Sequence, residues 1–93
     1  LAKDAEIIFL SGRGEQYREA TEDWIVKSFR AFDCLFMRPE GDSRPDYLVK
    51  DELFETHVAP NYNVLYCIDD RRCVVDMYRS KGILVLDVAG GDF

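Results

Sequence analysis

Four short runs of apolar residues recur along the chain, and each ends in polar residues or glycine. They are Ile7–Leu10, Cys34–Met37, Val64–Ile68 and Ile83–Leu86. None of them alternates between apolar and polar residues, as a strand with one wet face does. Short continuous runs are typical of strands that are buried on both faces of a parallel sheet. We therefore predict four buried parallel strands.

Segments with helical periodicity separate these runs, and we predict helices over residues 16–29, 45–58 and 71–81. The first helix places four residues roughly on one packing face: Tyr17, Ala20, Trp24 and Ile25. Asp42 or Ser43 can cap the second helix, whose first turn tolerates Pro45. Gly82 suits the position just past the third. This order of strands and helices predicts an α/β fold with right-handed crossovers.

The overall composition limits the range of functions. A chain of 93 residues fits one domain, and its net charge of −6 argues against tight non-specific binding of nucleic acid, although a local basic site remains compatible. The odd number of cysteines, Cys34, Cys67 and Cys73, indicates reduced thiols and a cytoplasmic setting. No run approaches membrane-spanning length, and no P-loop, GxGxxG, GxSxG or HExxH motif occurs. Leu1 is a cut point, a processing point or a chosen boundary.

Charged residues gather where the predicted strands end, which is the edge at which open parallel sheets bind ligands. Half of the 12 basic residues follow a strand in this way: Arg13, Arg38, Arg44, Lys50, Arg71 and Arg72. The last predicted strand leads into a Gly90–Gly91 turn and Asp92. An acidic protein that places its cations at this edge is expected to bind an anion there.

Two adjoining carboxylates, Asp69 and Asp70, directly follow the third run. Their mutual repulsion favours a cation such as Mg²⁺, which prefers one or two carboxylates together with water and phosphate oxygens. The alternative is that one of them caps the next helix. Ser11 can donate to a phosphoryl oxygen or serve as an ordinary turn residue.

Arg13 can bind a phosphoryl group with two hydrogen bonds. Lys50 can neutralise phosphate charge or form a surface pair with Asp46 at the i,i+4 spacing. His57, late in the second helix, is interpreted as structural because positive charge suits a helix end.

Several of these segments resemble a known family. Residues 7–13 look like the second motif of the haloacid dehalogenase superfamily, Lys50 looks like its third-motif lysine, and residues 68–71 look like its acidic fourth motif. Residues 41–54, 57–60, 68–71 and 88–93 are similar to the 3′-phosphatase domain of bacteriophage polynucleotide kinase/phosphatase. The resemblance implies a Rossmann-like three-layer parallel sheet with helices on both faces, and a Mg²⁺-dependent enzyme that removes 3′-phosphates from DNA or RNA ends.

The same resemblance implies roles for individual residues. Ser11 and Arg13 would contact the phosphoryl group, with Lys50 as a further cation and Asp46 orienting the basic groups. The substrate-binding residues would be Arg38, Arg44 and Arg71. Asp69 and Asp70 would hold Mg²⁺. Rival functions are a nucleotidase-like phosphatase of small molecules and a non-catalytic domain that binds nucleic-acid ends.

The chain departs from the family pattern because no Asp-x-Asp motif precedes Ser11. The family's nucleophile belongs to that motif, and the reaction passes through an aspartyl-phosphate. We therefore expect residues 1–93 to be a partial haloacid dehalogenase-like phosphatase domain that is inactive alone. An upstream segment of the same polypeptide or another chain would supply the central strand; alternatively, the strands of residues 6–10 and 64–68 pair directly. A preceding kinase domain and oligomerisation stay open.

Overall fold

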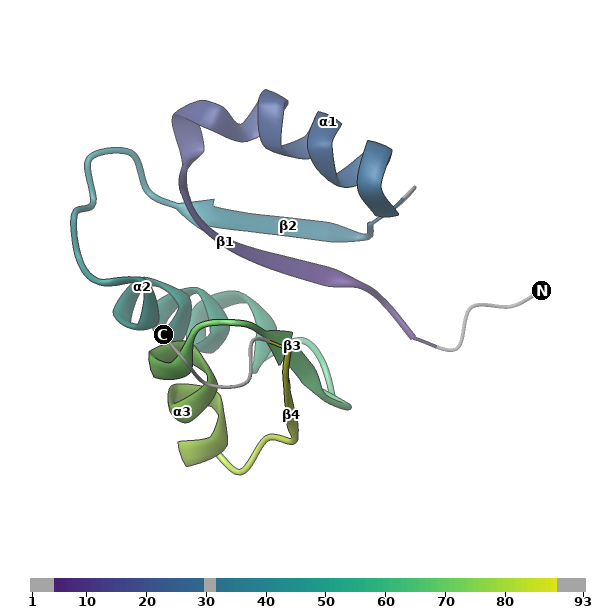
Figure 1. The fold of residues 1–93 in the computed structure, drawn as a ribbon, viewed down its shortest axis with the longest axis vertical. Helices are drawn as coiled ribbons and strands as arrows, with labels where there is room; N and C mark the ends of the chain where they lie inside the picture. Colours follow the sequence, from purple (N-terminus) through teal and green to yellow (C-terminus); the bar gives the residue numbers. More distant parts are fainter. Residues whose placement is uncertain (1–4, 30–31, 89–93) are drawn as a thin grey trace. The chain divides into compact units, whose positions relative to one another are not determined.

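The computed structural model describes residues 5–29 and 32–88 (Figure 1). The chain divides into two compact units, Leu1–Ser43 and Arg44–Phe93. Each unit combines helix with a pair of parallel strands, so the predicted α/β class is confirmed. The Gly90–Gly91 turn and Asp92 lie outside the described residues.

The first unit is a strand–helix–strand arrangement. Its elements are β1 (Ile8–Gly14), the 3₁₀ turn η1 (Glu15–Tyr17), α1 (Arg18–Phe29) and β2 (Cys34–Arg38). β1 and β2 pair in parallel, in a register that joins Phe9 to Leu35 and becomes irregular between Ser11 and Gly14. Helix α1 lies along this strand pair (Figure 1). The irregularity therefore falls at the carboxyl end of β1, where sequence analysis places a binding turn.

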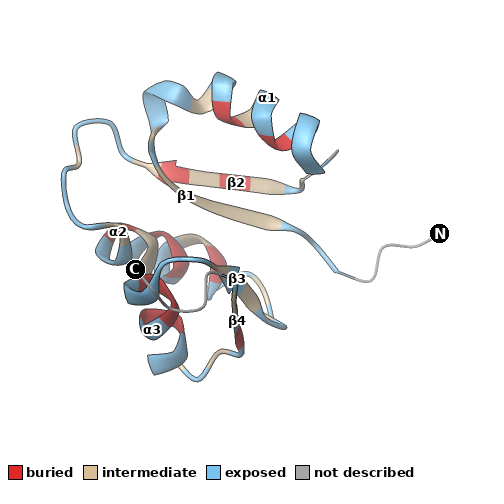
Figure 2. Ribbon diagram, in the orientation of Figure 1, coloured by how far each residue is buried: buried red, intermediate tan, exposed pale blue. Residues whose placement is uncertain are grey.

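One face of the β1–β2 pair forms the core of the first unit. Ile25 of α1 packs there with Leu35 and Met37 of β2, and Phe9 and Phe32 lie against this cluster. The buried positions of α1 accordingly face the strands in Figure 2. The helix is also tied to β2 by a hydrogen bond from Nη2 of Arg18 to the carbonyl oxygen of Leu35, at 2.9 Å.

The second unit contains the remaining elements. They are α2 (Asp46–Leu53), the π-helical turn η2 (Phe54–Val58), β3 (Cys67–Asp69), α3 (Arg72–Ser80) and β4 (Val85–Asp87). β3 and β4 pair in parallel, with Ile68 opposite Leu86. Gly82 adopts φ 81°, a left-handed conformation in which glycine is unstrained, and so ends α3 as predicted.

The core of the second unit lies between its helices and one face of the β3–β4 pair. Val49, Val74 and Val75 are completely buried. Each such side chain contributes about 1.5–3 kcal/mol relative to an exposed position. The rings of Phe54 and Tyr78 pack edge to face, with centroids 5.6 Å apart. Helices α2 and α3 therefore form one layer against the strands.

The strands of the second unit differ from the prediction that both of their faces are buried. Ile68, Leu84, Leu86 and Val88 are exposed, whereas Val85 is buried. The helices cover one face of this pair, and within the described residues the opposite face remains open. The third strand is also shorter than predicted, because it begins at Cys67 rather than Val64.

Each of the two sheets consists of two strands that belong to the same unit. The described strands form the orders β1–β2 and β3–β4. The alternative that the strands of residues 6–10 and 64–68 pair directly is therefore not realised among the described strands. In that same part, no helix is long and apolar enough to cross a membrane.

Two expectations about the helices are also corrected. Tyr17 and Trp24 were expected to pack on the buried face of α1, but they are 52% and 57% exposed. The residues of α1 that are buried are instead Thr21 and Ile25. The second helix begins directly after Pro45 with no side-chain cap, so neither Asp42 nor Ser43 caps it.

Candidate functional site

The irregular last part of β1, from Ser11 to Gly14, carries the first group of predicted site residues. The backbone N–H of Arg13 donates to Oγ of Ser11 at 3.1 Å, which closes a small turn around Gly12. Ser11 is half-buried and Arg13 is exposed. The guanidinium carbon of Arg13 lies 5.6 Å from the ring centroid of Tyr17, within the range of a cation–π contact. Sequence analysis did not anticipate this partner of Arg13.

Arg38 supports the same turn from β2. Its Nε donates to the carbonyl oxygen of Gly12 at 2.6 Å, and its Nη1 donates to the carbonyl oxygen of Asp42 at 3.0 Å. The Arg38 side chain is only 15% exposed. Its guanidinium thus joins the peptide between Ser11 and Arg13 to the loop that follows β2. These hydrogen bonds let Arg38 shape the turn, and its expected contact with phosphate stays a prediction.

Lys50 and Asp69 form an ion pair in the second unit. Nζ of Lys50 lies 3.1 Å from Oδ2 of Asp69, and the two side chains are 13% and 10% exposed. Oδ1 of Asp69 accepts hydrogen bonds from the backbone N–H groups of Asp70 and Arg71, at 2.8 and 3.1 Å. The surface pair of Lys50 with Asp46, considered as an alternative, is therefore not formed. Asp69 instead fixes both Lys50 and the loop before α3.

Asp70 has a different environment from its neighbour. Its side chain is exposed, and within the described residues its carboxylate makes no hydrogen bond or ion pair. Because Asp69 is held by Lys50 and two backbone N–H groups, Asp70 is the carboxylate of the two that faces solvent. The structure thereby separates two residues that the sequence could not tell apart.

These carboxylates can be tested against the needs of Mg²⁺. No three His, Cys, Asp or Glu residues of the described part come together as a metal-binding group. Mg²⁺ does not need such a cage, since it takes one or two carboxylates and fills its remaining positions with water and phosphate oxygens. The donor set of Asp70 with Asp69 therefore fits the protein's share of a Mg²⁺ site.

The other predicted arginines form ion pairs at the start of α2. Nη1 of Arg71 lies 3.6 Å from Oδ2 of Asp46, and Nη2 of Arg44 lies 2.8 Å from Oε2 of Glu52. Asp46 thus pairs with Arg71, whereas the expectation was that it orients Arg38 and Lys50. Arg44 and Arg71 remain largely exposed, so a substrate can exchange with these surface pairs.

His57 and the three cysteines were also singled out in the sequence, and the structure describes their contacts. His57 is half-buried in η2, and its carbonyl oxygen accepts a hydrogen bond from Nδ2 of Asn61 at 3.0 Å. All three cysteines are free, with Cys34 and Cys67 half-buried and Cys73 exposed. Burial, and secondarily the charge of Asp69, raises the pKa of the Cys67 thiol, which keeps it protonated.

Known proteins resemble this chain along most of its length. It matches the family of polynucleotide kinase PNKP phosphatase domains over residues 1–93. A protein of Autographa californica nuclear polyhedrosis virus, named "Putative bifunctional polynucleotide kinase/RNA ligase", is 44% identical over 81 residues. That match covers 86% of this chain and 12% of the viral protein.

Solved structures agree with this result. A chain of the Pnkp1/Rnl/Hen1 RNA repair complex superposes with a TM-score of 0.90 and 39% identity, over 98% of this chain and 30% of that chain. A chain of a second Pnkp1/Rnl/Hen1 complex gives a TM-score of 0.86 and 42% identity, over 95% of this chain and 31% of that chain. The chain thus spans under a third of the length of the relatives that it matches.

The parallel strands, the helices and the likeness to these structures define a haloacid dehalogenase-like fold. Within that fold class, the chain belongs to the family of polynucleotide kinase PNKP phosphatase domains. The family predicted from the sequence motifs is therefore confirmed.

Proposed function

We propose that the polypeptide containing these residues removes 3′-phosphates from nucleic-acid ends with the help of Mg²⁺. Membership of the phosphatase-domain family supports a phosphatase activity. The observation that carries the proposal is the arrangement at the end of β3, where Lys50 is held by Asp69 while Asp70 faces solvent. A lysine cation and a carboxylate that faces solvent thus lie together at the end of β3. Such a pair suits a phosphomonoester that is bound together with a metal ion.

The proposed roles are those that the family resemblance implies, and the contacts of each residue support them. The Ser11 hydroxyl and the Arg13 guanidinium bind oxygens of the phosphoryl group, and Lys50 stabilises the charge on that group during transfer. Asp69 positions Lys50. Asp70, together with Asp69, holds Mg²⁺, which supplies charge neutralisation of the phosphomonoester when bound.

Three further residues support these groups. Arg38 fixes the turn that presents Ser11 and Arg13. Asp46 orients Arg71, which with Arg44 offers exposed positive charge to the substrate. Arg44 and Arg71 favour a polyanionic substrate once it replaces their carboxylate partners, since phosphate contacts dominate affinity for nucleic acid.

The nucleophile of the reaction lies outside these residues in this proposal. The family's mechanism implies attack by an aspartate on phosphorus, departure of the 3′-hydroxyl, and hydrolysis of the aspartyl-phosphate by water. The net reaction converts a phosphomonoester and water into an alcohol and inorganic phosphate. We therefore expect the 93-residue chain alone to be inactive and the full-length protein to be active.

The direct test is phosphate release from a 3′-phosphorylated oligonucleotide by the full-length protein in the presence of Mg²⁺. Asp70→Asn is expected to lower kcat by about 100-fold or more, on the scale of losing one charge-stabilising group. Asp76→Asn, which removes an exposed carboxylate from α3, is the matched control and should retain activity. EDTA should abolish release by the wild type.

The outcomes separate the proposed activity from its rivals. Release that survives Asp70→Asn would contradict the metal role of Asp70. Turnover of free nucleotides or small phosphoesters without turnover of the oligonucleotide would identify a small-molecule phosphatase. Binding of 3′-phosphorylated ends with no turnover of any phosphoester would identify a non-catalytic end-binding domain.

A further inference from the structure

Tyr17 is an exposed aromatic residue next to the proposed phosphate-binding turn. It ends η1, directly after β1 and before α1, and its side chain is 52% exposed. Its backbone is fixed, because Oγ1 of the buried Thr21 donates to the carbonyl oxygen of Tyr17 at 2.9 Å. The backbone that carries the ring is thus held in place, and the ring itself does not belong to the core.

Arg13 connects this ring to the phosphate-binding turn. Its guanidinium carbon lies 5.6 Å from the centroid of the Tyr17 ring. A ligand whose phosphate binds Arg13 therefore places its next chemical group within reach of Tyr17. In a nucleotide that carries a 3′-phosphate, the sugar and then the base follow the phosphate.

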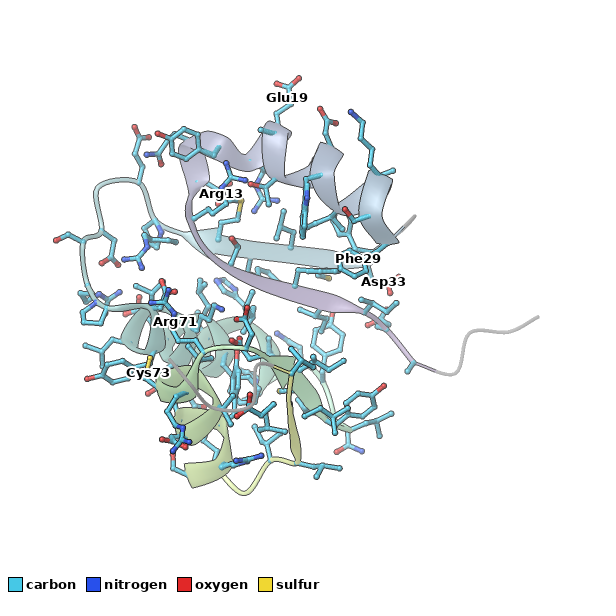
Figure 3. The ribbon with its side chains drawn as sticks, viewed as in Figure 1. Arg13, Glu19, Phe29, Asp33, Arg71 and Cys73 are labelled. Atoms are coloured by element: carbon cyan, nitrogen blue, oxygen red, sulfur yellow. The ribbon has the colours of Figure 1, made fainter. Side chains whose placement is uncertain are left out.

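An open hollow of about 360 Å³ adjoins the same ring. Its lining residues are Gln16, Tyr17, Glu19, Ala20 and Asp23. The volume lies at the lower end of the range for small-molecule sites, roughly 300–1,000 Å³. Glu19 points from α1 away from the strands (Figure 3), so the hollow opens on the outer side of the helix. Tyr17 belongs both to the hollow and to the contact with Arg13.

We propose that Tyr17 and this hollow form a subsite for the base of the 3′-terminal nucleotide. The subsite rests on the proposed function, since it needs a 3′-phosphate at Arg13. The Tyr17 ring provides a stacking surface, which accepts any base because every base has a π-face.

The charges of the hollow favour a base over a further phosphate. Glu19 and Asp23 repel the phosphate backbone, but their carboxylates can accept hydrogen bonds from the amino groups of bases. Gln16 can both donate and accept. The preceding phosphate of the strand is therefore expected to lie outside this hollow, at positively charged residues.

The test compares two 3′-phosphorylated oligonucleotides that differ only at the last nucleotide. One ends in a normal base, and the other ends in a tetrahydrofuran abasic analogue. In the full-length protein, Tyr17→Leu is expected to raise KM about tenfold for the first substrate and to leave KM for the second unchanged, a size typical of losing one base–aromatic stack. Tyr17→Phe retains the ring and should behave as the wild type.

Trp24→Leu is the matched control, because Trp24 is an equally exposed aromatic residue of α1 that does not line the hollow. An equal rise in KM for both substrates in Tyr17→Leu would overturn the base subsite, because the ring would then act only through its contact with Arg13. Unchanged KM values would overturn it as well, and so would a matching rise in Trp24→Leu.

Binding measured by fluorescence anisotropy separates this inference from the proposed function. A wild type that turns over neither oligonucleotide would contradict the phosphatase activity. If that protein still binds the normal end more tightly than the abasic end, and Tyr17→Leu removes the preference, the subsite stands. If it shows no such preference, the subsite fails too.

Discussion

At the scale of single residues, the two adjoining aspartates at the end of β3 have different environments. Asp69 accepts hydrogen bonds from Lys50 and from two backbone N–H groups, whereas Asp70 extends into solvent. The Lys50–Asp69 pair is nearly buried, so solvent screens it weakly. Removing one partner of such a pair leaves an uncompensated charge, which costs more than the loss of a surface ion pair.

Asp69→Asn should therefore destabilise the protein by about 3 kcal/mol, since it leaves Lys50 without its counter-charge. The asparagine oxygen can still accept from the two backbone N–H groups, which isolates the effect of the ion pair. Asp70→Asn should change the free energy of unfolding by less than about 0.5 kcal/mol, as for a surface residue. Urea unfolding measures both values. Equal stabilities of the two variants would contradict the division of roles.

The sequence singled out candidate residues for the chemistry but did not predict how they pair. Lys50 was placed either at phosphate or with Asp46, because i,i+4 spacing is visible in a sequence, whereas its contact with Asp69 bridges 19 positions. Likewise, Arg38 reaches the carbonyl of Gly12 across 26 positions. Such pairings depend on how helices pack on strands, which local patterns do not encode.

At the scale of elements, α3 and η2 of the second unit meet in one aromatic pair. Tyr78 of α3 is buried, and its ring packs against Phe54. Burial is the main cause that raises the pKa of the Tyr78 phenol, and repulsion from the Cys67 thiolate that forms in alkali and from Asp69 and Asp51 adds to it. The folded protein therefore keeps this phenol protonated at pH values where the unfolded chain ionises it.

This shift predicts a loss of stability in alkali. The contribution of Tyr78 is fully present below its unfolded pKa, near 10, and is lost as pH rises from there towards the raised folded pKa. Because Tyr78→Phe has no phenol to ionise, the wild type should lose up to about 1.4 kcal/mol per pH unit more than this variant above pH 10. Below pH 9 the difference between them should be constant. Parallel curves over the whole range, measured by urea unfolding, would contradict the buried phenol.

The elements themselves were largely predictable, and the errors have physical causes. The helices of residues 16–29, 45–58 and 71–81 were placed within a few residues, because periodicity and glycine signals are local. The third strand was predicted three residues too long at its start, since Val64, Leu65 and Tyr66 are apolar. An apolar run indicates that its residues are buried, but the start of a strand depends on where backbone hydrogen bonds to a neighbouring strand begin.

At the scale of the whole molecule, the chain is a small part of the proteins that it resembles. It covers 12% of its viral relative and 30% of a solved relative. Both strand pairs are parallel, and parallel sheets normally have both faces covered. The β3–β4 pair instead exposes Ile68, Leu84, Leu86 and Val88 on one face. A contiguous apolar surface of this kind marks a site of contact or of aggregation.

The 93-residue chain in isolation is therefore expected to bind hydrophobic dyes and to self-associate through this face. Leu86→Lys should lower both, because Leu86 lies opposite Ile68 and a charge between them breaks the apolar surface. Leu48→Lys, at an exposed leucine of α2, is the control and should change neither. Dye fluorescence and sedimentation velocity, at matched helix content by circular dichroism, measure the effect. Unchanged association in folded Leu86→Lys would show that another surface drives it.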